Sequence, residues 1–236
     1  MPDAILISEL YGPVIQGEGA LVGQVSHFVR TSGCPYRCVW CDSPHAVDPV
    51  LIKEKSRSLM PSEIISEVQA LPPAPWVTIT GGDPVAWDLT EVVAGLKGKF
   101  KLTIETQGSL WSDWLEDIGL VTCSPKPPSS GMSDRLDIVI LQKYAARLQD
   151  KLAFKCVVFD KDDLDFAERI HRCFPGQRFF ITAGTPLASD PRIGVQMQVI
   201  DGYRSVVEAV LERPKLLDVT VTCQQHVLLY GRELGR

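Results

Sequence analysis

The sequence predicts an α/β protein built on one mostly parallel sheet. Short apolar runs rich in β-branched residues recur along the chain, which is the composition of buried strands. Segments with apolar residues at helical spacing lie between these runs. The 236 residues show no shift in composition that would separate two domains. Together these observations predict βα units around one sheet and a single domain over residues 1–236.

Each expected strand is a β-branched or aromatic run that ends at polar or turn-forming residues. In chain order the expected strands are Ile5–Leu10, Val25–Thr31, Trp76–Thr80, Lys101–Glu105, Leu120–Ser124, Phe154–Phe159, Arg178–Thr182 and a last one near Leu216–Val221. Helices are expected over residues 64–71, 89–96, 164–170 and 206–211. Ligands of such sheets bind beyond the carboxyl ends of the strands, so the residues that follow each strand are the candidates for a site.

Composition excludes several classes of protein. Hydrophobic residues make up 45% of the chain and charged residues 22%, which is typical of folded globular proteins and excludes a disordered or fibrous chain. The formal net charge is -5 and the basic residues are scattered, so no nucleic-acid partner is expected. The first residues lack a secretory signal, and no run approaches the roughly 20 apolar residues of a membrane span. We therefore expect a cytoplasmic protein with no membrane contact.

Three cysteines follow the second expected strand within one short loop. Three residues separate Cys34 from Cys38, and two separate Cys38 from Cys41. In a reducing compartment such a group indicates metal binding or catalysis rather than a disulfide framework. A loop of this size can wrap its thiolates around one face of a 4Fe-4S cubane and leave one iron without a protein ligand. An open coordination site is what a catalytic cluster requires.

A structural zinc site is the alternative interpretation of this loop. Zinc of that kind normally takes four protein ligands. The fourth could come from His45 or from one of the remaining cysteines, which are Cys123, Cys156, Cys173 and Cys223. Those cysteines lie in or beside expected strands and a helix, where a lone cysteine is usually a small buried hydrophobe. The spacing therefore favours the cluster and leaves zinc as the alternative.

The cysteine loop, with Trp40 directly before the third cysteine, resembles the CxxxCxxC signature of the radical S-adenosylmethionine (SAM) superfamily. The resemblance implies that Cys34, Cys38 and Cys41 hold a 4Fe-4S cluster whose fourth iron binds SAM. It also implies a partial or modified (β/α) radical SAM barrel. Reductive cleavage of SAM would then yield a 5'-deoxyadenosyl radical.

Two segments upstream of the cysteine loop narrow this resemblance to one family. Residues 15–19 read Ile-Gln-Gly-Glu-Gly and residues 28–30 read Phe-Val-Arg, similar to the substrate-binding opening of the 7-carboxy-7-deazaguanine synthases. The implied substrate-binding residues are Ile15, Gln16, Gly17, Glu18, Arg30 and Thr80. Gln16 and Glu18 can present an amide and a carboxylate to the edge of a 2-amino-4-oxo pterin, and Arg30 can pair with the substrate carboxylate. Alternatively, these residues form an ordinary turn and a solvated strand end.

Three further motifs resemble the family's cofactor site. Residues 80–84 resemble its GGEP motif, residues 105–108 its ETxG motif, and residues 124–128 its SPK segment. The implied cofactor-binding residues are Gly81, Gly82, Asp83, Glu105, Ser124, Pro125 and Lys126. Asp83 stands where Glu is commoner, so we expect a backbone contact there rather than one from the side chain. Each motif also has a structural interpretation. Residues 80–84 would be an ordinary Gly-Gly turn, Glu105 would cap the next helix, and residues 124–128 would form a rigid surface turn.

The family resemblance implies a reaction and its requirements. The expected reaction converts 6-carboxy-5,6,7,8-tetrahydropterin to 7-carboxy-7-deazaguanine with release of ammonia, and it begins with hydrogen abstraction from the pterin. Ser43 stands where Thr usually lends an oxygen to Mg²⁺, with Asp42 expected to point away; the alternative is that Ser43 only caps the loop. The implied partners are a flavodoxin- or ferredoxin-like electron donor and a second copy of the chain in a homodimer. His226, in the closing segment of residues 225–231, is expected to be structural or to lie at the dimer interface.

The sequence also allows two rival functions. Another small radical SAM enzyme, for example an activating enzyme for a glycyl-radical protein, would share the cysteine loop without needing Gln16, Glu18 and Arg30. A non-enzymatic module would bind zinc or an iron-sulfur cluster without responding to SAM. The sequence does not name the pathway that receives the product.

Overall fold

A computed structural model describes residues 3–186, 194–231, 233 and 235. Its centre is a nine-stranded sheet with the strand order β3-β1-β2-β4-β5-β6-β7-β8-β9. The strands are β1 (Ile5–Ile15), β2 (Val25–Thr31), β3 (Arg57–Leu59), β4 (Trp76–Gly81), β5 (Lys101–Thr106), β6 (Leu120–Cys123), β7 (Leu152–Val158), β8 (Arg178–Ala183) and β9 (Thr220–Thr222).

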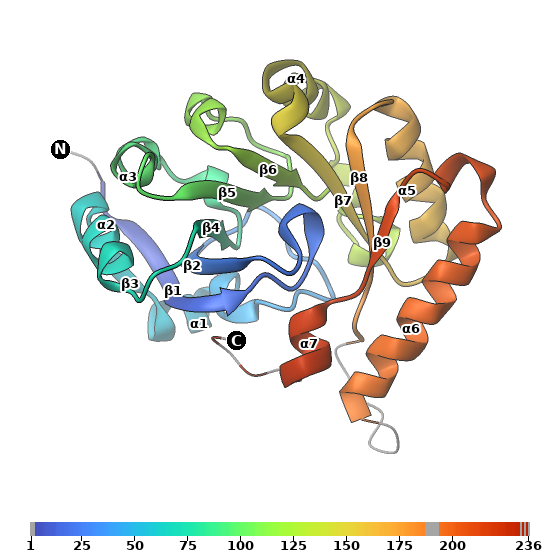
Figure 1. Cartoon of the computed structure of the whole chain (residues 1–236), viewed down its shortest axis with the longest axis horizontal. Helices are drawn as coiled ribbons and strands as arrows, with labels where there is room; N and C mark the ends of the chain where they lie inside the picture. Colours follow the sequence, from blue (N-terminus) through green and yellow to red (C-terminus); the bar gives the residue numbers. More distant parts are fainter. Residues whose placement is uncertain (1–2, 187–193, 232, 234, 236) are drawn as a thin grey trace.

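The sheet is mostly parallel and curved. β1 pairs antiparallel with β2 and β3, whereas every pairing from β2 to β9 is parallel. Figure 1 shows the strands curling round a central space, with the edge strands β3 and β9 far apart in the strand order. This arrangement is a partial (β/α) barrel, which confirms the predicted fold class.

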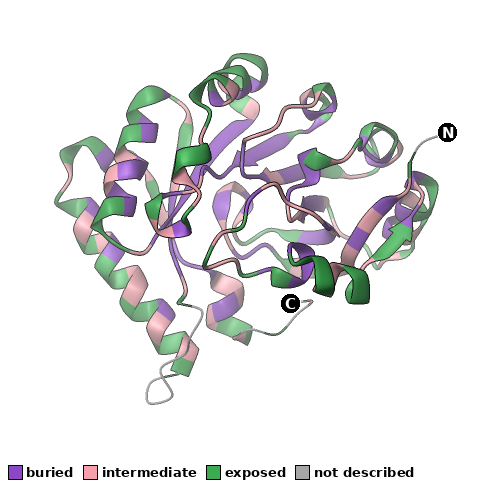
Figure 2. Cartoon of the chain, turned by 180° about the vertical axis from the view of Figure 1, so that it is seen from behind, coloured by how far each residue is buried: buried purple, intermediate pink, exposed green. Residues whose placement is uncertain are grey.

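The described residues form seven α-helices, most of which cover the outer side of the curved sheet. They are α1 (Pro49–Lys55), α2 (Pro61–Ala70), α3 (Thr90–Leu96), α4 (Ile138–Leu148), α5 (Lys161–Cys173), α6 (Gly194–Leu211) and α7 (Gln225–Tyr230). Figure 2 shows buried strands and helices whose outward surfaces are exposed. Within the described part of the chain, no helix has the length and apolar character needed to cross a membrane.

The two faces of the strands carry different side chains. Successive residues of a strand point to opposite sides, and Ile79, Ile104 and Phe154 belong to the apolar core between sheet and helices. The intervening positions hold buried polar residues, among them Thr80, Thr103, Thr122, Lys155 and Thr182. The interior of the curved sheet is therefore polar, whereas its helix-facing side is apolar.

Buried hydroxyl groups on the inner face have hydrogen-bond partners. The Ser26 and Thr78 hydroxyls lie 2.8 Å apart across β2 and β4. Those of Thr182 and Thr222 lie 3.0 Å apart across β8 and β9. Because an unpaired buried polar group costs free energy, these pairs allow a polar interior without a large loss of stability.

The structure contains elements that the sequence pattern did not predict. The short helix α1 and the three-residue strand β3 were missed, and so was α4. The buried residues Leu141, Tyr144 and Leu148 of α4 follow helical spacing, so the signal was present there. The last strand was expected to begin at Leu216 but begins at Thr220, because Pro214–Leu216 form a 3-10 turn.

Candidate functional site

A pocket of about 350 Å³ lies at the carboxyl ends of the parallel strands. Its walls come from the loop after β2, the ends of β4 and β5, the strand β7, and the C-terminal segment. Most predicted site residues line it, namely Ile15, Gln16, Gly17, Glu18, Arg30, Cys34, Cys38, Cys41, Ser43, Thr80, Gly81, Gly82, Glu105, Ser124 and Lys126. Asp83 and Pro125 are buried and are not among the lining residues.

The cysteine loop is held in place by the segment of residues 128–135. The Val39 N–H donates to the Ser130 carbonyl at 3.1 Å. Arg135 Nη1 donates to the Pro35 carbonyl at 2.7 Å, and the Tyr36 hydroxyl donates to the Arg135 carbonyl at 2.8 Å. The conformation of the loop is thus set by contacts of the polypeptide itself.

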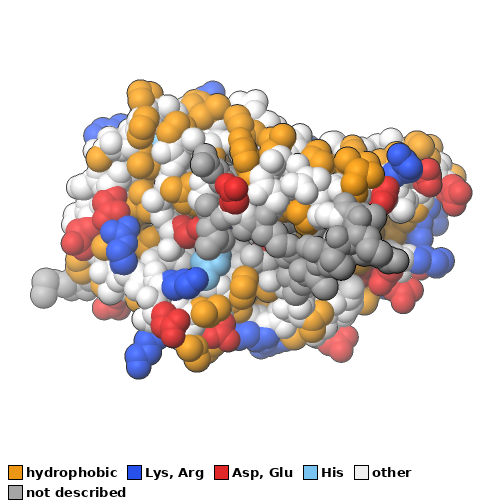
Figure 3. All heavy atoms as spheres, turned by 90° about the horizontal axis from the view of Figure 1, so that it is seen from below, with side chains coloured by type: hydrophobic (Ala, Val, Ile, Leu, Met, Phe, Trp, Pro, Cys, Tyr) orange, Lys and Arg blue, Asp and Glu red, His pale blue; other side chains and the backbone are white. Residues whose placement is uncertain are grey.

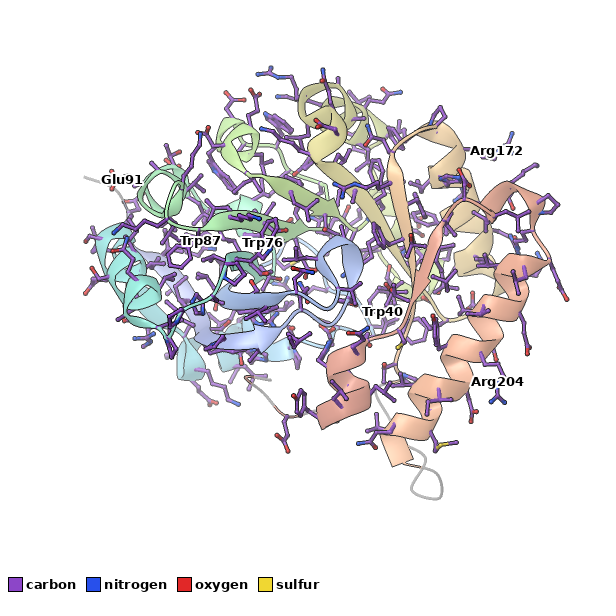
Figure 4. The ribbon with its side chains drawn as sticks, in the orientation of Figure 1. Trp40, Trp76, Trp87, Glu91, Arg172 and Arg204 are labelled. Carbon is purple, nitrogen blue, oxygen red and sulfur yellow. The ribbon has the colours of Figure 1, made fainter. Side chains whose placement is uncertain are left out.

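Trp40 is fixed through a buried carboxylate on α5. Its indole Nε1 donates to Ser129 Oγ at 2.9 Å, and its ring centroid lies 5.3 Å from that of Phe159. Ser129 Oγ in turn donates to Asp163 Oδ2 at 2.6 Å, and the Ser129 N–H donates to Oδ1 at 2.9 Å. Figure 4 shows Trp40 on the inner side of the fold, in contrast to Arg172 and Arg204, which point outward from α5 and α6. Asp163 therefore positions the residue next to Cys41.

The three loop thiols suit a cluster better than a single ion. Cys34, Cys38 and Cys41 are free and half-buried, and burial raises the pKa of the Cys34 thiol to about 11. No three Cys, His, Asp or Glu side chains among the described residues converge on one metal-ion position. A cubane needs only one thiol at each iron, whereas zinc draws all of its ligand atoms to about 2.0–2.3 Å.

The other candidate zinc ligands are engaged elsewhere. Cys123 and Cys156 lie in the apolar core, Cys173 is exposed on α5, and Cys223 packs with Val199 and Val227. His45 Nε2 lies 3.1 Å from Glu9 Oε2. Among the described residues, no fourth cysteine is free to join the three loop thiols and His45 is paired with Glu9, which favours a cluster over a four-ligand zinc site.

The Gly81-Gly82 turn lines the pocket with backbone alone, because neither residue has a side chain. The Gly82 and Asp83 N–H groups already donate to the carbonyls of Thr31 and Gly33, at 3.0 and 2.8 Å. A Cβ at Gly82 would collide with the Gly33 carbonyl and lie 2.8 Å from that of Ala46. Glycine is thus required by close backbone packing, and the turn offers carbonyl oxygens, the acceptors that an ammonium group needs.

Asp83 stabilises this turn from beneath. Its carboxylate accepts hydrogen bonds from Thr106 Oγ1 at 2.8 Å, from Gln107 Nε2 at 2.8 Å and from the Val85 N–H at 3.2 Å. Burial raises the pKa of this carboxyl, against the effect of these donors. The side chain thus serves the conformation of the turn, and the expected backbone contact of this turn with the cofactor stays a prediction.

A cluster of charged side chains lies in the same pocket. Lys155 Nζ donates to Glu18 Oε1 at 2.8 Å and lies 3.8 Å from Glu105 Oε1. Gln16 Nε2 donates to the same Glu105 oxygen at 3.2 Å. Glu105, expected at the cofactor, is therefore in contact with Gln16 and is linked through Lys155 to Glu18, both of which were expected at the substrate.

The pKa values of Glu18 and Glu105 shift in opposite directions in this environment. Burial raises the pKa of Glu18, but the charge and hydrogen bond of Lys155, together with the nearby His226, outweigh it, so the pKa is lowered overall. The pKa of Glu105 is raised, since burial and the Glu18 charge outweigh the more distant Lys155. Burial opposes the charge of Lys155, yet Glu105 and Glu18 raise its pKa overall. Glu18 and Lys155 thus form the tighter ion pair.

Arg30 is already oriented by neighbouring side chains. Its Nε donates to Glu9 Oε2 at 2.6 Å, and its Nη1 donates to Ser43 Oγ at 3.1 Å. Glu9 also binds His45, so one carboxylate fixes two side chains of the pocket wall. The guanidinium faces the pocket with only part of its donors used.

The prediction that Asp42 points away is wrong. Asp42 lines the pocket, where its Oδ1 accepts from Ser43 Oγ at 3.2 Å and its Oδ2 from Gln224 Nε2 at 3.3 Å. Gln224 lies 182 residues further along the chain, so its amide was not visible in the local motif. Desolvation in the pocket opposes the charge of Asp42, but nearby Arg30 above all lowers the pKa of this carboxyl overall.

The C-terminal segment closes the pocket against the Gln16–Glu18 turn. The Gln225 N–H donates to the Gly17 carbonyl at 2.9 Å, and a Cβ at Gly17 would collide with the His226 ring. His226 therefore lines the pocket, a position that the sequence did not predict. At the opposite wall, Lys126 Nζ donates to Ser124 Oγ at 3.2 Å and lies 5.7 Å from the Trp40 ring centroid.

Comparison with known proteins identifies the family. The model of the radical SAM superfamily matches residues 28–121. The 7-carboxy-7-deazaguanine synthase of Bacillus cereus is 36% identical over 98% of this chain and 98% of its own length. That of Bacillus subtilis is 33% identical over 100% of both chains. The chain belongs to the 7-carboxy-7-deazaguanine synthase family.

The fold agrees with this family assignment. A crystal structure of QueE from Escherichia coli matches with a TM-score of 0.70 at 20% identity, over 94% of this chain and 95% of that chain. The resemblance found in the cysteine loop and the glycine motifs is thereby confirmed at the level of the family. Because this family belongs to the radical SAM superfamily, the enzyme uses a 4Fe-4S cluster and SAM.

Some pocket residues of this family member were missed from sequence. Lys155 lies in the apolar run Leu152–Val158, and a lysine in such a strand is an informative exception that sequence reasoning could have used. Tyr11 and Phe28 line the pocket with stacked rings, their centroids 5.4 Å apart. Nothing local marks that pair, because it forms across the antiparallel β1 and β2.

Asp163→Ala is expected to loosen the cysteine loop. The change removes charge-assisted hydrogen bonds to Ser129 and should lower the free energy of unfolding by about 3 kcal/mol. It should also reduce the iron bound per chain after reconstitution, because Trp40 loses its fixed partner. Urea unfolding of the metal-free protein and iron analysis measure both effects. Asp165→Ala, which removes a solvent-accessible carboxylate from the same helix, is the control and should cost clearly less stability; equal losses in the two variants would contradict the role of Asp163.

Proposed function

We propose that this pocket binds the carboxylated tetrahydropterin at Gln16, Glu18 and Arg30 and binds SAM and the cluster at the cysteine loop and the Gly81-Gly82 turn. As a member of its family, the chain catalyses the conversion of 6-carboxy-5,6,7,8-tetrahydropterin to 7-carboxy-7-deazaguanine with release of ammonia. The observation that supports the assignment of residues is that one pocket brings three free thiols together with a buried set of carboxylate, amide and guanidinium groups.

The proposed roles follow from the chemistry of each group. Bound together, the cluster and SAM supply the radical that starts the ring contraction. Cys34, Cys38 and Cys41 would each ligate one iron, and the carbonyls of the Gly81-Gly82 turn would accept from the methionyl amino group. Ser124 and Lys126 remain assigned to the cofactor side. Their contact with each other and with Trp40 supports that assignment.

The polar residues at the other end of the pocket bind and orient the substrate. Glu18 and Glu105 are acceptors for the N–H groups of a 2-amino-4-oxo ring, and Gln16 adds an amide. Arg30 is the cation for the substrate carboxylate, with Glu9 holding its Nε. We accordingly move Glu105 from the cofactor set to the substrate set. Closure by residues 224–227 shields the ring from water.

Further partners are part of the same proposal. The reaction needs a one-electron donor, for which we propose a flavodoxin- or ferredoxin-like protein, and we propose a homodimer and a bound Mg²⁺. Figure 3 shows acidic and basic side chains interspersed with hydrophobic ones on the lower face of the molecule. The expectation of no nucleic-acid partner and of a cytoplasmic location stays a prediction.

Turnover under anaerobic conditions tests the proposed function. The reconstituted enzyme, SAM, a chemical reductant and the carboxylated tetrahydropterin should yield 7-carboxy-7-deazaguanine and ammonia. Cleavage of SAM without a deazaguanine product would favour the rival of another small radical SAM enzyme. That rival has no use for the pocket set of Gln16, Glu18 and Arg30.

The cysteine variants test the three-thiol site. Cys34→Ala, Cys38→Ala and Cys41→Ala should each abolish cluster-dependent cleavage of SAM, because each removes the ligand of one iron. Cys173→Ala is the matched control, since its thiol is exposed on α5 outside the pocket. Iron and sulfide analysis and SAM cleavage are measured on all four. Loss of the cluster in Cys173→Ala would refute the proposed ligand set.

Arg30→Ala tests the substrate carboxylate site. Loss of one partner of a desolvated charge pair costs about 2–5 kcal/mol, so the KM for the pterin should rise far more than that for SAM. Arg57→Ala, which removes a largely exposed arginine on β3, is the control and should leave both KM values unchanged. Equal losses of affinity for pterin and SAM would show that Arg30 supports the whole pocket instead of binding the substrate.

We propose that Ser43 contributes to a magnesium site. Its hydroxyl accepts from Arg30 and donates to Asp42, which leaves one lone pair free, since a hydroxyl can accept twice. The alternative of a loop cap is not supported, because the side chain makes no capping hydrogen bond to the following turn. Mg²⁺ prefers six oxygen ligands and keeps several waters, so Ser43 and substrate oxygens could suffice.

Mg²⁺ should stimulate turnover, and this stimulation should depend on the Ser43 hydroxyl. Ser43→Thr keeps the oxygen and should preserve the stimulation, whereas Ser43→Ala should largely remove it. Deazaguanine formation is measured against added Mg²⁺ after chelation. An unchanged response in Ser43→Ala would place the ion elsewhere.

A further inference from the structure

Lys155 lies in the middle of β7 and is buried inside the curved sheet. Its neighbours Phe154 and Cys156 point to the helix-facing core, so Lys155 points inward, where it lines the pocket. Its side chain is only 6% exposed. Burying an ammonium group is costly unless carboxylates compensate it. Glu18 and Glu105 provide that compensation.

We propose that Lys155 is a positioning residue that gives the enzyme its selectivity for the amino-bearing edge of the substrate ring. It binds one oxygen of Glu18 and thereby directs the other toward the N–H donors of the ring. The inference rests on the proposed function, because it concerns the same pterin.

The two oxygens of Glu18 have different surroundings. Oε1 accepts from Lys155 Nζ at 2.8 Å, whereas Oε2 is buried and has no hydrogen-bond partner in the part of the chain that the structure describes. A buried carboxylate oxygen without a donor is destabilising, and in native proteins such a group calls for an explanation. A ligand N–H group is the explanation that its position in the pocket supports.

The neighbouring amide is already oriented. Gln16 Oε1 accepts from the Gly17 N–H at 2.8 Å, and its Nε2 donates to Glu105 at 3.2 Å. The oxygen that Gln16 binds on Glu105 is also the one that lies 3.8 Å from Lys155. Lys155 and Gln16 therefore hold two carboxylates as a pair of acceptors. A 2-amino-4-oxo ring presents adjacent N–H donors that match such a pair.

A purely structural role does not account for this lysine. Replacing a buried ion pair by well-packed apolar residues is often neutral or stabilising, so stability alone does not require Lys155. Removing Lys155 alone, however, would leave Glu18 and Glu105 facing each other without a cation. One of them would then take up a proton or turn away, and the paired acceptors would be lost.

Equilibrium binding measures the selectivity directly. The ligands are 6-carboxytetrahydropterin and its analogue without the 2-amino group, titrated anaerobically into reconstituted enzyme with SAM. The wild type should bind the amino-bearing pterin about 10²-fold more tightly than the analogue, because a site built for N–H donors rejects a ligand that lacks one. In Lys155→Met the ratio should fall to within about threefold, and in Lys155→Arg it should stay at about tenfold or more.

Controls separate this effect from damage to the fold. SAM affinity and iron content should stay within about twofold of wild type in Lys155→Met. Lys143→Met, an exposed lysine on α4, should change nothing. If Lys155→Met fails to fold, Glu18→Gln in the same chain removes the uncompensated charge. That double variant should fold and load the cluster, yet still show no preference for the 2-amino group.

Two outcomes would overturn the proposal in distinguishable ways. A ratio of about 10² retained in Lys155→Met or in the double variant would refute the role of Lys155 and leave the proposed function intact. Failure of the wild type to bind or convert the pterin would overturn the proposed function, and this inference with it.

Discussion

The alternation of side chains along the parallel strands is the constraint on which the rest of this structure depends. One face of β4, β5 and β7 must be apolar to pack against the helices. The other face is enclosed by the curvature of the sheet and carries threonines and charged groups. Since enclosed polar groups must be paired, the interior becomes a network in which each partner limits the position of the next.

Pairing of charged side chains arranges the pocket in the same way. Arg30 is held by Glu9 and contacts Ser43, while Lys155 is held by Glu18. Arg30 thus joins β2 to β1 and to the cysteine loop, and Lys155 joins β7 to the turn that holds Glu18. The pocket is therefore arranged by the protein itself. Such preorganisation reduces the ordering that ligands would otherwise have to impose on binding.

The loops at the rim of the sheet are held instead by close packing of one loop backbone on another. The Gly81-Gly82 turn packs directly on the loop after β2, and residues 128–135 hold the cysteine loop. The strand β4 and the cysteine loop thus meet without intervening side chains. This contact brings the thiols and the backbone acceptors of the turn into one pocket.

The sequence by itself determined the α/β class, the cysteine loop and the glycine turn, because each depends on neighbouring residues and on the local backbone. Most of the site residues that it predicted line the pocket, since they follow successive strands that end at one edge. Only the tertiary structure decided their partners. Lys155 meets Glu18 across 137 residues and Asp42 meets Gln224 across 182. Such pairs depend on the curvature and register of the whole sheet, which no local pattern encodes.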